Sequence, residues 1–322
     1  MMGRRLLVNL AALTAAQRAA LTAAAESQGF EAVFRDDAAS ARSAAGDAEI
    51  IFSIDAGLIE CAPALKWFCT PFAGVDQYIR PALLDREGVL LSGSTGAYGV
   101  TISEHVVMVT LDMMRGMDKY QALVRRRGWR RDLPVRSIKG CRALLLGTGD
   151  IGRETAKRLR AFGPASIIGV NRSGHAQPGI FDAVYPIAGL DRLLPGADLL
   201  VMSLPGTPLT EKLMDERRLS LLGADAYIVN VGRGAAIDTA ALLELMRRGH
   251  LAGAALDVFP EEPLPPESPL WDCPRLLITP HVAGNMTLPY TVQRVTELFL
   301  EDFQRYCEGQ PLLRGIAVDR GY

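Results

Sequence analysis

The chain has 322 residues, enough for two domains, and its hydrophobic content of 49% supports sizeable cores. Its net charge of −1, with lysines and arginines not gathered into one block, gives no reason to expect a nucleic-acid partner. No apolar run reaches the ~20 residues of a membrane span, and the five cysteines lack CxxC pairing and ligand spacing, so we expect a cytoplasmic protein with reduced thiols and no metal site.

Short apolar runs alternate with helical segments over the first ~95 residues, which predicts a small α/β unit with a parallel sheet. No long apolar stretch typical of a signal peptide precedes the first run. Thr14 is expected to cap an alanine-rich helix that ends near Gln28. The expected strands are residues 4–9, 30–34, 49–53 and 66–70.

A turn of small residues follows the fourth of these strands and contains Phe72, Ala73 and Gly74. Open α/β sheets bind ligands at the carboxyl ends of their strands. The backbone N–H groups of Ala73 and Gly74 can therefore bind a carboxylate, but the local sequence is equally compatible with an ordinary turn. Phe72 is a candidate for an apolar wall of the same pocket.

A glycine-rich crossing at residues 92–99 leads into a long, mostly apolar segment. We predict one helix from Val100 to about Arg127, buried on more than one side and suited to a subunit contact. His105 lies near its start, where we interpret it as a structural or interface residue rather than a catalyst.

The run from Arg142 to Arg153 predicts a buried strand, a glycine turn and the start of a helix. Gly147, Gly149 and Gly152 form G-x-G-x-x-G: the first permits the tight turn, the second a close approach to a pyrophosphate, and the third close packing of helix on strand. The helix N-terminus would offer N–H donors and a positive dipole end to the phosphates. The motif alone is a weak signal, but a second strand follows at residues 166–170, so the context predicts a dinucleotide site.

Strands and helices continue to alternate, which is typical of a doubly wound parallel sheet. Further strands are expected within residues 181–186, 198–205, 225–234, 251–258 and 276–284, with helices at 239–248 and 287–307 and a final strand at 312–318. We interpret the tail as returning to the first domain. The predicted fold is therefore α/β, with two Rossmann-like doubly wound domains. A dinucleotide-binding domain (100–287) is inserted into a discontinuous, flavodoxin-like substrate domain (1–99 and 288–322).

Three ionisable residues follow strands of the second sheet: Arg233, Glu262 and His281. Two glycines, Gly232 and Gly234, flank Arg233 and are expected to leave its surroundings open. Taken singly, they also fit a surface arginine, a loop carboxylate and a turn residue. Together they fit the reduction of a 2-oxo acid by a nicotinamide. In that reaction His281 would be the general acid/base, Glu262 would orient its imidazole, and Arg233 would bind the carboxylate and carbonyl oxygens. We expect small molecules, rather than nucleic acid or membrane, as partners.

Over nearly its whole length the chain resembles the D-isomer-specific 2-hydroxyacid dehydrogenase family. The segments that carry the resemblance are 147–152, 230–234, 255–264, 268–271 and 279–284, with a similar substrate-loop region at 66–76. The resemblance implies Arg233 as substrate anchor, Glu262 as partner of His281, and His281 as acid/base. It also implies that the Ala73–Gly74 backbone binds the substrate carboxylate, and it favours a homodimer with the 100–127 segment in the contact.

The resemblance further implies a set of residues around the cofactor. They are Gly147, Gly149, Asp150, Ile151, Gly152, Leu204, Pro205, Val231, Gly232, Asp257 and Gly284. Members that prefer NAD generally carry an aspartate at the end of the second nucleotide-domain strand, where this chain has Asn171, followed by Arg172 and Ser173. Asn171 removes the repulsion of a 2′-phosphate that Arg172 and Ser173 can bind, so we predict NADP(H), with NAD(H) as the alternative.

The leading hypothesis is an NADP(H)-linked reductase of 2-oxo acids such as glyoxylate or hydroxypyruvate. One alternative is a dehydrogenase of a phosphorylated hydroxy acid, which would need additional cations near the substrate loop. The other is a nucleotide-sensing binding protein on the same fold, like the family's corepressors. Turnover of 2-oxo acids separates the sensor from the enzymes.

Overall fold

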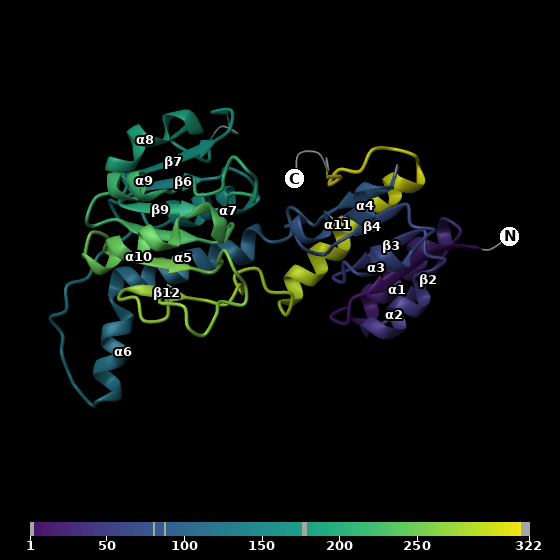
Figure 1. Ribbon diagram of the computed structural model, residues 1–322, viewed down its shortest axis with the longest axis horizontal. Coiled ribbons are helices and arrows are strands. Elements are labelled where there is room, and N and C mark those ends of the chain that lie inside the picture. The colour runs from purple at the N-terminus through teal and green to yellow at the C-terminus, as the bar shows by residue number, and fades with distance from the viewer. Residues whose placement is uncertain (1–2, 80, 87, 176–178, 317–322) are drawn as a thin grey trace. The chain divides into compact units, whose positions relative to one another are not determined.

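The computed structural model describes residues 3–79, 81–86, 88–175 and 179–316 (Figure 1). The chain forms two compact units: unit 1 comprises Met1–Tyr98 and Asn285–Tyr322, and unit 2 comprises Gly99–Gly284. Each unit contains a parallel sheet with helices packed against it, so the predicted α/β fold class is confirmed.

Unit 1 has a five-stranded sheet in the order β2-β1-β3-β4-β5, which is the flavodoxin-like order. Its strands are β1 (Arg4–Asn9), β2 (Phe30–Phe34), β3 (Ile50–Ser53), β4 (Trp67–Cys69) and β5 (Leu90–Ser92). Its helices are α1 (Ala15–Ser27), α2 (Ala38–Ala44), α3 (Leu58–Cys61), η1 (Asp76–Tyr78), α4 (Pro81–Leu84) and α11 (Pro289–Cys307). Thr14 caps α1, because its side chain accepts from the Gln17 backbone N–H and the Gln17 side chain accepts from the Thr14 N–H.

Stacked aromatic rings hold α11 against the unit 1 sheet. The Phe299 ring lies 4.3 Å from that of Phe52 on β3 and 5.2 Å from that of Trp67 on β4, measured between centroids. All three side chains are fully buried. Large aromatic side chains contribute much of a core's burial energy, so α11 is part of the core of unit 1 although more than 180 residues separate it from the first segment of that unit.

The end of the chain differs from its prediction. A strand was expected at 312–318, but the described residues to 316 form only one antiparallel bridge, from Gly315 to Ser92. The Asp302 carboxylate of α11 accepts from the Leu313 backbone N–H at 2.7 Å and pairs with Arg314 at 3.3 Å. These contacts tie residues 313 and 314 to α11. Gly315 and Ile316 then reach β5, a strand that the prediction missed. Residues 317 and 318 lie outside the described residues.

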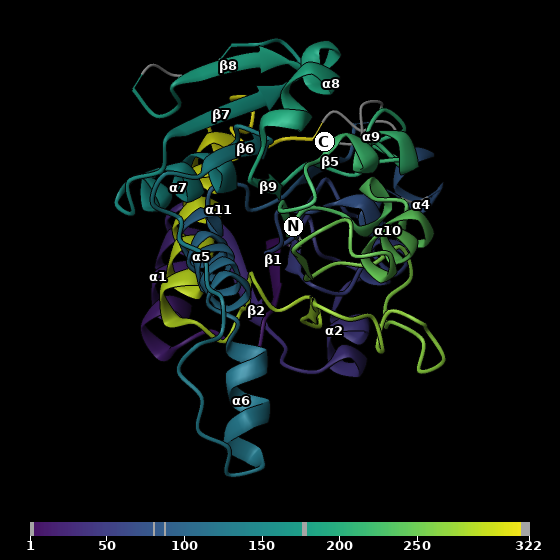
Figure 2. The same ribbon diagram turned by 90° about the vertical axis from the view of Figure 1, so that its left-hand side faces the viewer.

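Unit 2 has a seven-stranded parallel sheet in the order β12-β11-β10-β9-β6-β7-β8. The strands are β6 (Arg142–Leu146), β7 (Ser166–Asn171), β8 (Ala183–Pro186), β9 (Leu199–Met202), β10 (Tyr227–Asn230), β11 (Gly253–Leu256) and β12 (Leu276–Ile278). Numbered within the unit, the order is 3-2-1-4-5-6-7, the dinucleotide-binding arrangement with one added strand. Figure 2 shows β8, β7 and β6 side by side. The central strands read as unbroken apolar runs because both faces of the sheet are covered.

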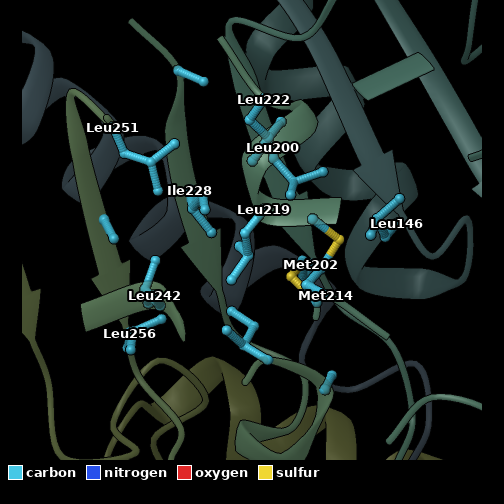
Figure 3. Packing of buried hydrophobic residues seen from close by; sticks show 14 of the residues in the cluster. Leu146, Leu200, Met202, Met214, Leu219, Leu222, Ile228, Leu242, Leu251 and Leu256 are labelled. Atoms are coloured by element: carbon cyan, nitrogen blue, oxygen red, sulfur yellow. The ribbon is translucent and has the colours of Figure 1, made fainter. Parts of the chain in front are cut away.

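Helices pack on the sheet of unit 2 and bury an extended apolar cluster. Figure 3 shows part of it, with Leu200 and Met202 of β9 and Ile228 of β10 close to Leu219 and Leu242. The helices of the unit are α5 (Gly99–Arg115), α6 (Met117–Arg125), α7 (Asp150–Arg160), η2 (Ile187–Gly189), α8 (Leu190–Leu193), η3 (Leu194–Gly196), α9 (Glu216–Leu221), η4 (Gly234–Ala236) and α10 (Thr239–Arg247). Within the described residues, no helix combines the length and apolarity that crossing a bilayer requires.

The long helix predicted from Val100 to Arg127 is two helices. Gly116 lies between α5 and α6 with φ +60°, a left-handed conformation that interrupts the helical hydrogen bonds and that glycine adopts readily. The backbone N–H of Arg136 then donates to the Met114 carbonyl at the end of α5. In Figures 1 and 2, α6 and the residues after it extend away from the rest of unit 2.

Candidate active site

Loops at one edge of the unit 2 sheet carry most of the predicted site residues. Strands β10, β11 and β12 are neighbours and parallel, so their carboxyl ends lie along the same edge. Arg233 follows β10, Glu262 follows β11 and His281 follows β12. The glycine turn after β6 and the Leu204–Pro205 segment after β9 lie along the same edge. Sheet topology therefore brings together residues from distant parts of the sequence.

His281 and Glu262 form a close pair. The Nδ1 atom of His281 lies 2.6 Å from Oε2 of Glu262, while Oε1 of Glu262 accepts from the Phe259 backbone N–H at 2.8 Å. Both carboxylate oxygens are thus engaged, which holds the carboxylate in place. The His281 side chain stays 55% exposed, and Nε2 is the ring nitrogen that Glu262 does not engage.

Asp257 holds the backbone around His281 by accepting hydrogen bonds from it. His281 has φ +53°, and its N–H donates to the Asp257 carbonyl at 2.9 Å. Asp257 is 97% buried, and its carboxylate accepts from the Thr279 hydroxyl at 2.6 Å and from the backbone N–H groups of Val282 and Ala283 at 2.9 and 3.0 Å. This carboxylate shapes the loop, a role that the sequence did not reveal. Its predicted contact with a cofactor stays a prediction.

The glycines beside Arg233 have a different purpose from the one expected, which was to leave open space around it. A Cβ on Gly232 would lie 2.7 Å from the backbone N and O of Leu204, and a Cβ on Gly234 only 2.0 Å from the carbonyl carbon of Phe259. The interpretation of open surroundings was therefore wrong. Two neighbouring loops press against this backbone, and only glycine fits at either position.

Asn230 also holds the Arg233 loop and was not among the predicted site residues. It is the last residue of β10 and is 99% buried. Its Nδ2 donates to the Arg233 carbonyl at 2.9 Å and its Oδ1 accepts from the Gly232 N–H at 3.1 Å. One signal in the sequence could have identified Asn230: it is an amide at the end of an apolar strand, three residues before Arg233. A polar group that is buried there needs hydrogen-bond partners nearby.

The turn and packing expected of the first and third motif glycines are present, whereas the phosphate contact expected of the second stays a prediction. Gly147 has φ +105°, and a Cβ there would lie 2.7 Å from Ser203 Oγ. A Cβ on Gly152 would lie 2.0 Å from the Gly147 carbonyl oxygen, so helix and turn touch directly. A Cβ on Gly149 would meet no protein atom within 4 Å. Gly149 is the N-cap of α7 and provides no side-chain cap, and the free space at its Cβ position leaves room for an anion to approach the start of the helix.

The other predicted cofactor residues around the turn differ in exposure. The Asp150 carboxylate accepts from the Gly99 N–H at 2.8 Å and so links the starts of α7 and α5. Leu204 and Val231 are buried, whereas Pro205 is exposed. Ile151 and Gly284 are partly exposed at the start of α7 and at the end of the His281 loop. Contact of these residues with a dinucleotide stays a prediction.

Asn171 organises the loop after β7 through both ends of its side-chain amide. Its Nδ2 donates to the Thr148 hydroxyl at 2.7 Å and to the His175 carbonyl at 2.6 Å. Its Oδ1 accepts from the N–H groups of Ser173 and Gly174 at 3.1 and 2.7 Å. The loop is therefore closed on itself and joined to the glycine turn. Arg172 and Ser173 are both exposed on it.

The Phe72–Gly74 segment belongs to unit 1, whereas the predicted catalytic and cofactor residues belong to unit 2. The segment follows β4, and the Phe72 carbonyl accepts from the Ser94 N–H at 2.8 Å. Ala73 and Gly74 are partly exposed there. Over the described residues, no group of three or more histidine, cysteine or acidic side chains has an arrangement that could hold a metal ion.

Comparison with known proteins gives matches over nearly all of the chain. Residues 107–283 match the family model described as D-isomer specific 2-hydroxyacid dehydrogenase, NAD binding domain. A glyoxylate/hydroxypyruvate reductase A of Yersinia enterocolitica is 37% identical over 264 residues, which are 78% of this chain and 79% of that protein.

Two solved structures are similar to the whole chain. One is a D-isomer specific 2-hydroxyacid dehydrogenase family protein of Aeromonas salmonicida, with a TM-score of 0.86, 35% identity and coverage of 98% of this chain and 99% of that one. The other is an NADPH-dependent glyoxylate/hydroxypyruvate reductase of Sinorhizobium meliloti in complex with NADP and sulfate, with a TM-score of 0.83, 30% identity and coverage of 99% and 100%.

Proposed function

The chain belongs to the D-isomer-specific 2-hydroxyacid dehydrogenase family, and on this basis we propose that it reduces small 2-oxo acids such as glyoxylate or hydroxypyruvate with NADPH. The observation that carries the proposal is the His281–Glu262 pair, at 2.6 Å, on the sheet edge that also bears the dinucleotide turn. The names of the Yersinia and Sinorhizobium relatives support these substrates.

His281 would move the proton. Glu262 Oε2 engages Nδ1, so Nε2 is the ring nitrogen left to face the substrate. During reduction, a protonated Nε2 donates to the substrate oxygen as negative charge develops on it, and in the reverse direction the neutral Nε2 accepts the hydroxyl proton. The nicotinamide, when bound, supplies the hydride. Glu262, held by the Phe259 N–H, keeps the imidazole from rotating.

Arg233 would anchor the substrate. A planar guanidinium can donate two parallel hydrogen bonds to a carboxylate, which orients the acid as well as binding it. Asn230 and the two flanking glycines hold the backbone of Arg233 between neighbouring loops, and this fixes the origin of a long side chain. The role proposed for Ala73 and Gly74 in binding the same carboxylate remains a prediction from the sequence.

The dinucleotide would bind along the glycine turn, with its phosphates at the N-terminus of α7, beside Gly149. The matched family model is described by NAD, whereas the Sinorhizobium relative holds NADP. The loop after β7 favours NADP here, because Asn171 is neutral and its side chain is fully engaged with the loop backbone and Thr148. Arg172 and Ser173 then supply a cation and a hydroxyl for the 2′-phosphate.

Replacing Arg172 with alanine tests this assignment. We expect KM for NADPH to rise roughly 10- to 100-fold, the value of one or two charge-assisted hydrogen bonds, while KM for NADH stays unchanged. Steady-state rates with both cofactors measure the change. Arg160→Ala is the matched control, because Arg160 is the last residue of α7 and pairs with Asp182. A wild-type preference for NADH would contradict the assignment.

A panel of substrates tests the proposed reaction. We expect the purified chain to oxidise NADPH with glyoxylate and hydroxypyruvate, and to do so faster than with a phosphorylated 2-oxo acid, followed at the absorbance of the reduced cofactor. Fast turnover of only the phosphorylated acid would replace the proposed substrate class. Tight NADPH binding without turnover of any acid would contradict the proposal.

We also propose that the chain forms a homodimer through the surface shared by α5 and α7. Met108 on α5 and Phe162, just after α7, are 55% and 40% exposed, and a shallow hollow between them is lined mainly by apolar atoms. A second copy would cover them. Light scattering should give twice the mass of one chain, and Met108→Glu should shift it toward the monomer. A wild-type monomer at micromolar concentration would overturn this proposal.

A further inference from the structure

His105 on α5 takes no part in the proposed chemistry, yet its imidazole reaches the loop of His281. Its Nε2 lies 3.4 Å from the Thr279 hydroxyl oxygen, across 174 residues of sequence. Thr279 is two residues before His281 and directly follows β12. The sequence pointed to a structural or interface role for His105 without naming a partner.

The direction of the hydrogen bonds follows from the number of protons available. The Thr279 hydroxyl donates its single hydrogen to Asp257 Oδ1, 2.6 Å away. Thr279 can then only accept from His105, so the His105 Nε2 must carry a hydrogen. Burial lowers the pKa of His105, although the charge of nearby Asp257 opposes this, so the ring acts as a neutral Nε2–H donor.

Asp257 is the other end of this chain of hydrogen bonds and holds the segment that bears the catalytic imidazole. Its side chain binds Thr279 on one side of His281 and the N–H groups of Val282 and Ala283 on the other. The segment needs such support because the φ of His281, +53°, is a left-handed conformation that is unfavourable for a residue other than glycine. If the hydrogen bonds to Asp257 were weakened, the backbone would relax and the His281 imidazole would move relative to Glu262.

We propose that His105 is a positioning residue for the reaction. Through Thr279 and Asp257 it holds residues 279–283 in the conformation that keeps His281 Nδ1 against Glu262. This inference rests on the proposed function, because it assigns the acid/base role to His281. It connects helix α5 to the catalytic loop through side chains alone.

Four variants test the proposal: H105L, H105Q, T279V and the double variant H105L/T279V. Leucine removes the donor, whereas the Nε2 of glutamine lies the same number of bonds from the backbone as that of histidine. We expect H105L to lower kcat about 3- to 10-fold, the value of one neutral hydrogen bond, with KM for the 2-oxo acid within twofold. H105Q should keep kcat within twofold of wild type. Adding H105L to T279V should lower kcat no further, since both substitutions break the same series of hydrogen bonds.

Hydrogen exchange gives a readout that does not depend on turnover. The amides of Val282 and Ala283 should exchange about 3- to 10-fold faster in H105L but not in H105Q, while the Val231 amide, bonded to the Met202 carbonyl, stays unchanged. If H105L does not fold, His105→Asn replaces it, because its shorter amide cannot reach Thr279. Equal impairment of H105L and H105Q, or independent effects of H105L and T279V, would overturn the proposal. If the wild-type chain shows no turnover, the proposed function fails, and the exchange data still decide whether His105 holds the loop.

Discussion

Replacing His281 with asparagine is expected to lower kcat by about 100- to 10,000-fold, the usual range for loss of a general acid/base. Asparagine is chosen because it tolerates the left-handed backbone of this position and because its amide can still donate to Glu262 Oε2, as Nδ1 does. What it lacks is the second ring nitrogen, which alone faces the substrate in the proposed mechanism. Steady-state kinetics with NADPH and glyoxylate measures the loss.

The variant should bind NADPH as the wild type does, since its change lies in proton transfer. Cofactor titration by fluorescence checks this. His250→Asn is the matched control, because His250 lies between α10 and the amino end of β11, away from the edge where the site is built. A kcat for the His281 variant within a few-fold of wild type would remove His281 from the chemistry.

Arg233→Gln is expected to lower kcat/KM by roughly 30- to 4,000-fold, equivalent to about 2–5 kcal/mol for truncating one partner of a desolvated charge pair. Most of the loss should appear as a higher KM for the acid, because the guanidinium binds its carboxylate. Arg233→Lys should recover only part of the loss, since an ammonium group cannot make two parallel hydrogen bonds in one plane. Kinetics over a range of acid concentrations separates KM from kcat.

A neutral substrate makes this test specific. Wild-type protein should prefer a 2-oxo acid to its methyl ester, and Arg233→Gln should lose most of that preference. Arg217→Gln is the control, because Arg217 pairs with Asp191 on an exposed part of unit 2. If the Arg233 variant keeps both its KM for the acid and its discrimination against the ester, the substrate is anchored elsewhere.

The positions of the proposed site residues could be predicted from the sequence where they follow strand order; their roles stay predictions. Arg233, Glu262 and His281 each come after an apolar strand, and parallel strands of one sheet end on the same edge, so the order of strands along the chain was enough to expect them on one edge. The same logic placed the dinucleotide turn. It failed for Gly232 and Gly234, where an interpretation as open space was wrong, because a glycine in a sequence does not say whether a neighbouring backbone fills the room it leaves.

Local pattern also missed interruptions. The long apolar segment after residue 100 reads as one helix because its periodicity continues past Gly116, and only the left-handed backbone there ends α5. The short strand β5 escaped notice because three residues carry almost no periodic signal. β5 is a strand because it pairs with β4 on one side and because Gly315 of the tail forms a bridge to Ser92.

By itself the sequence determined the two parallel sheets, the dinucleotide turn and the types of residue that follow the strands, because apolar periodicity and glycine spacing are properties of contiguous residues. Tertiary structure alone decided which polar groups stand behind the site: Asp257 beneath the His281 loop, Asn171 across the loop after β7, and His105 joined to Thr279. Such contacts depend on where two distant backbone segments come to lie, within a few tenths of an ångström, and hydrogen bonds form or fail over that distance.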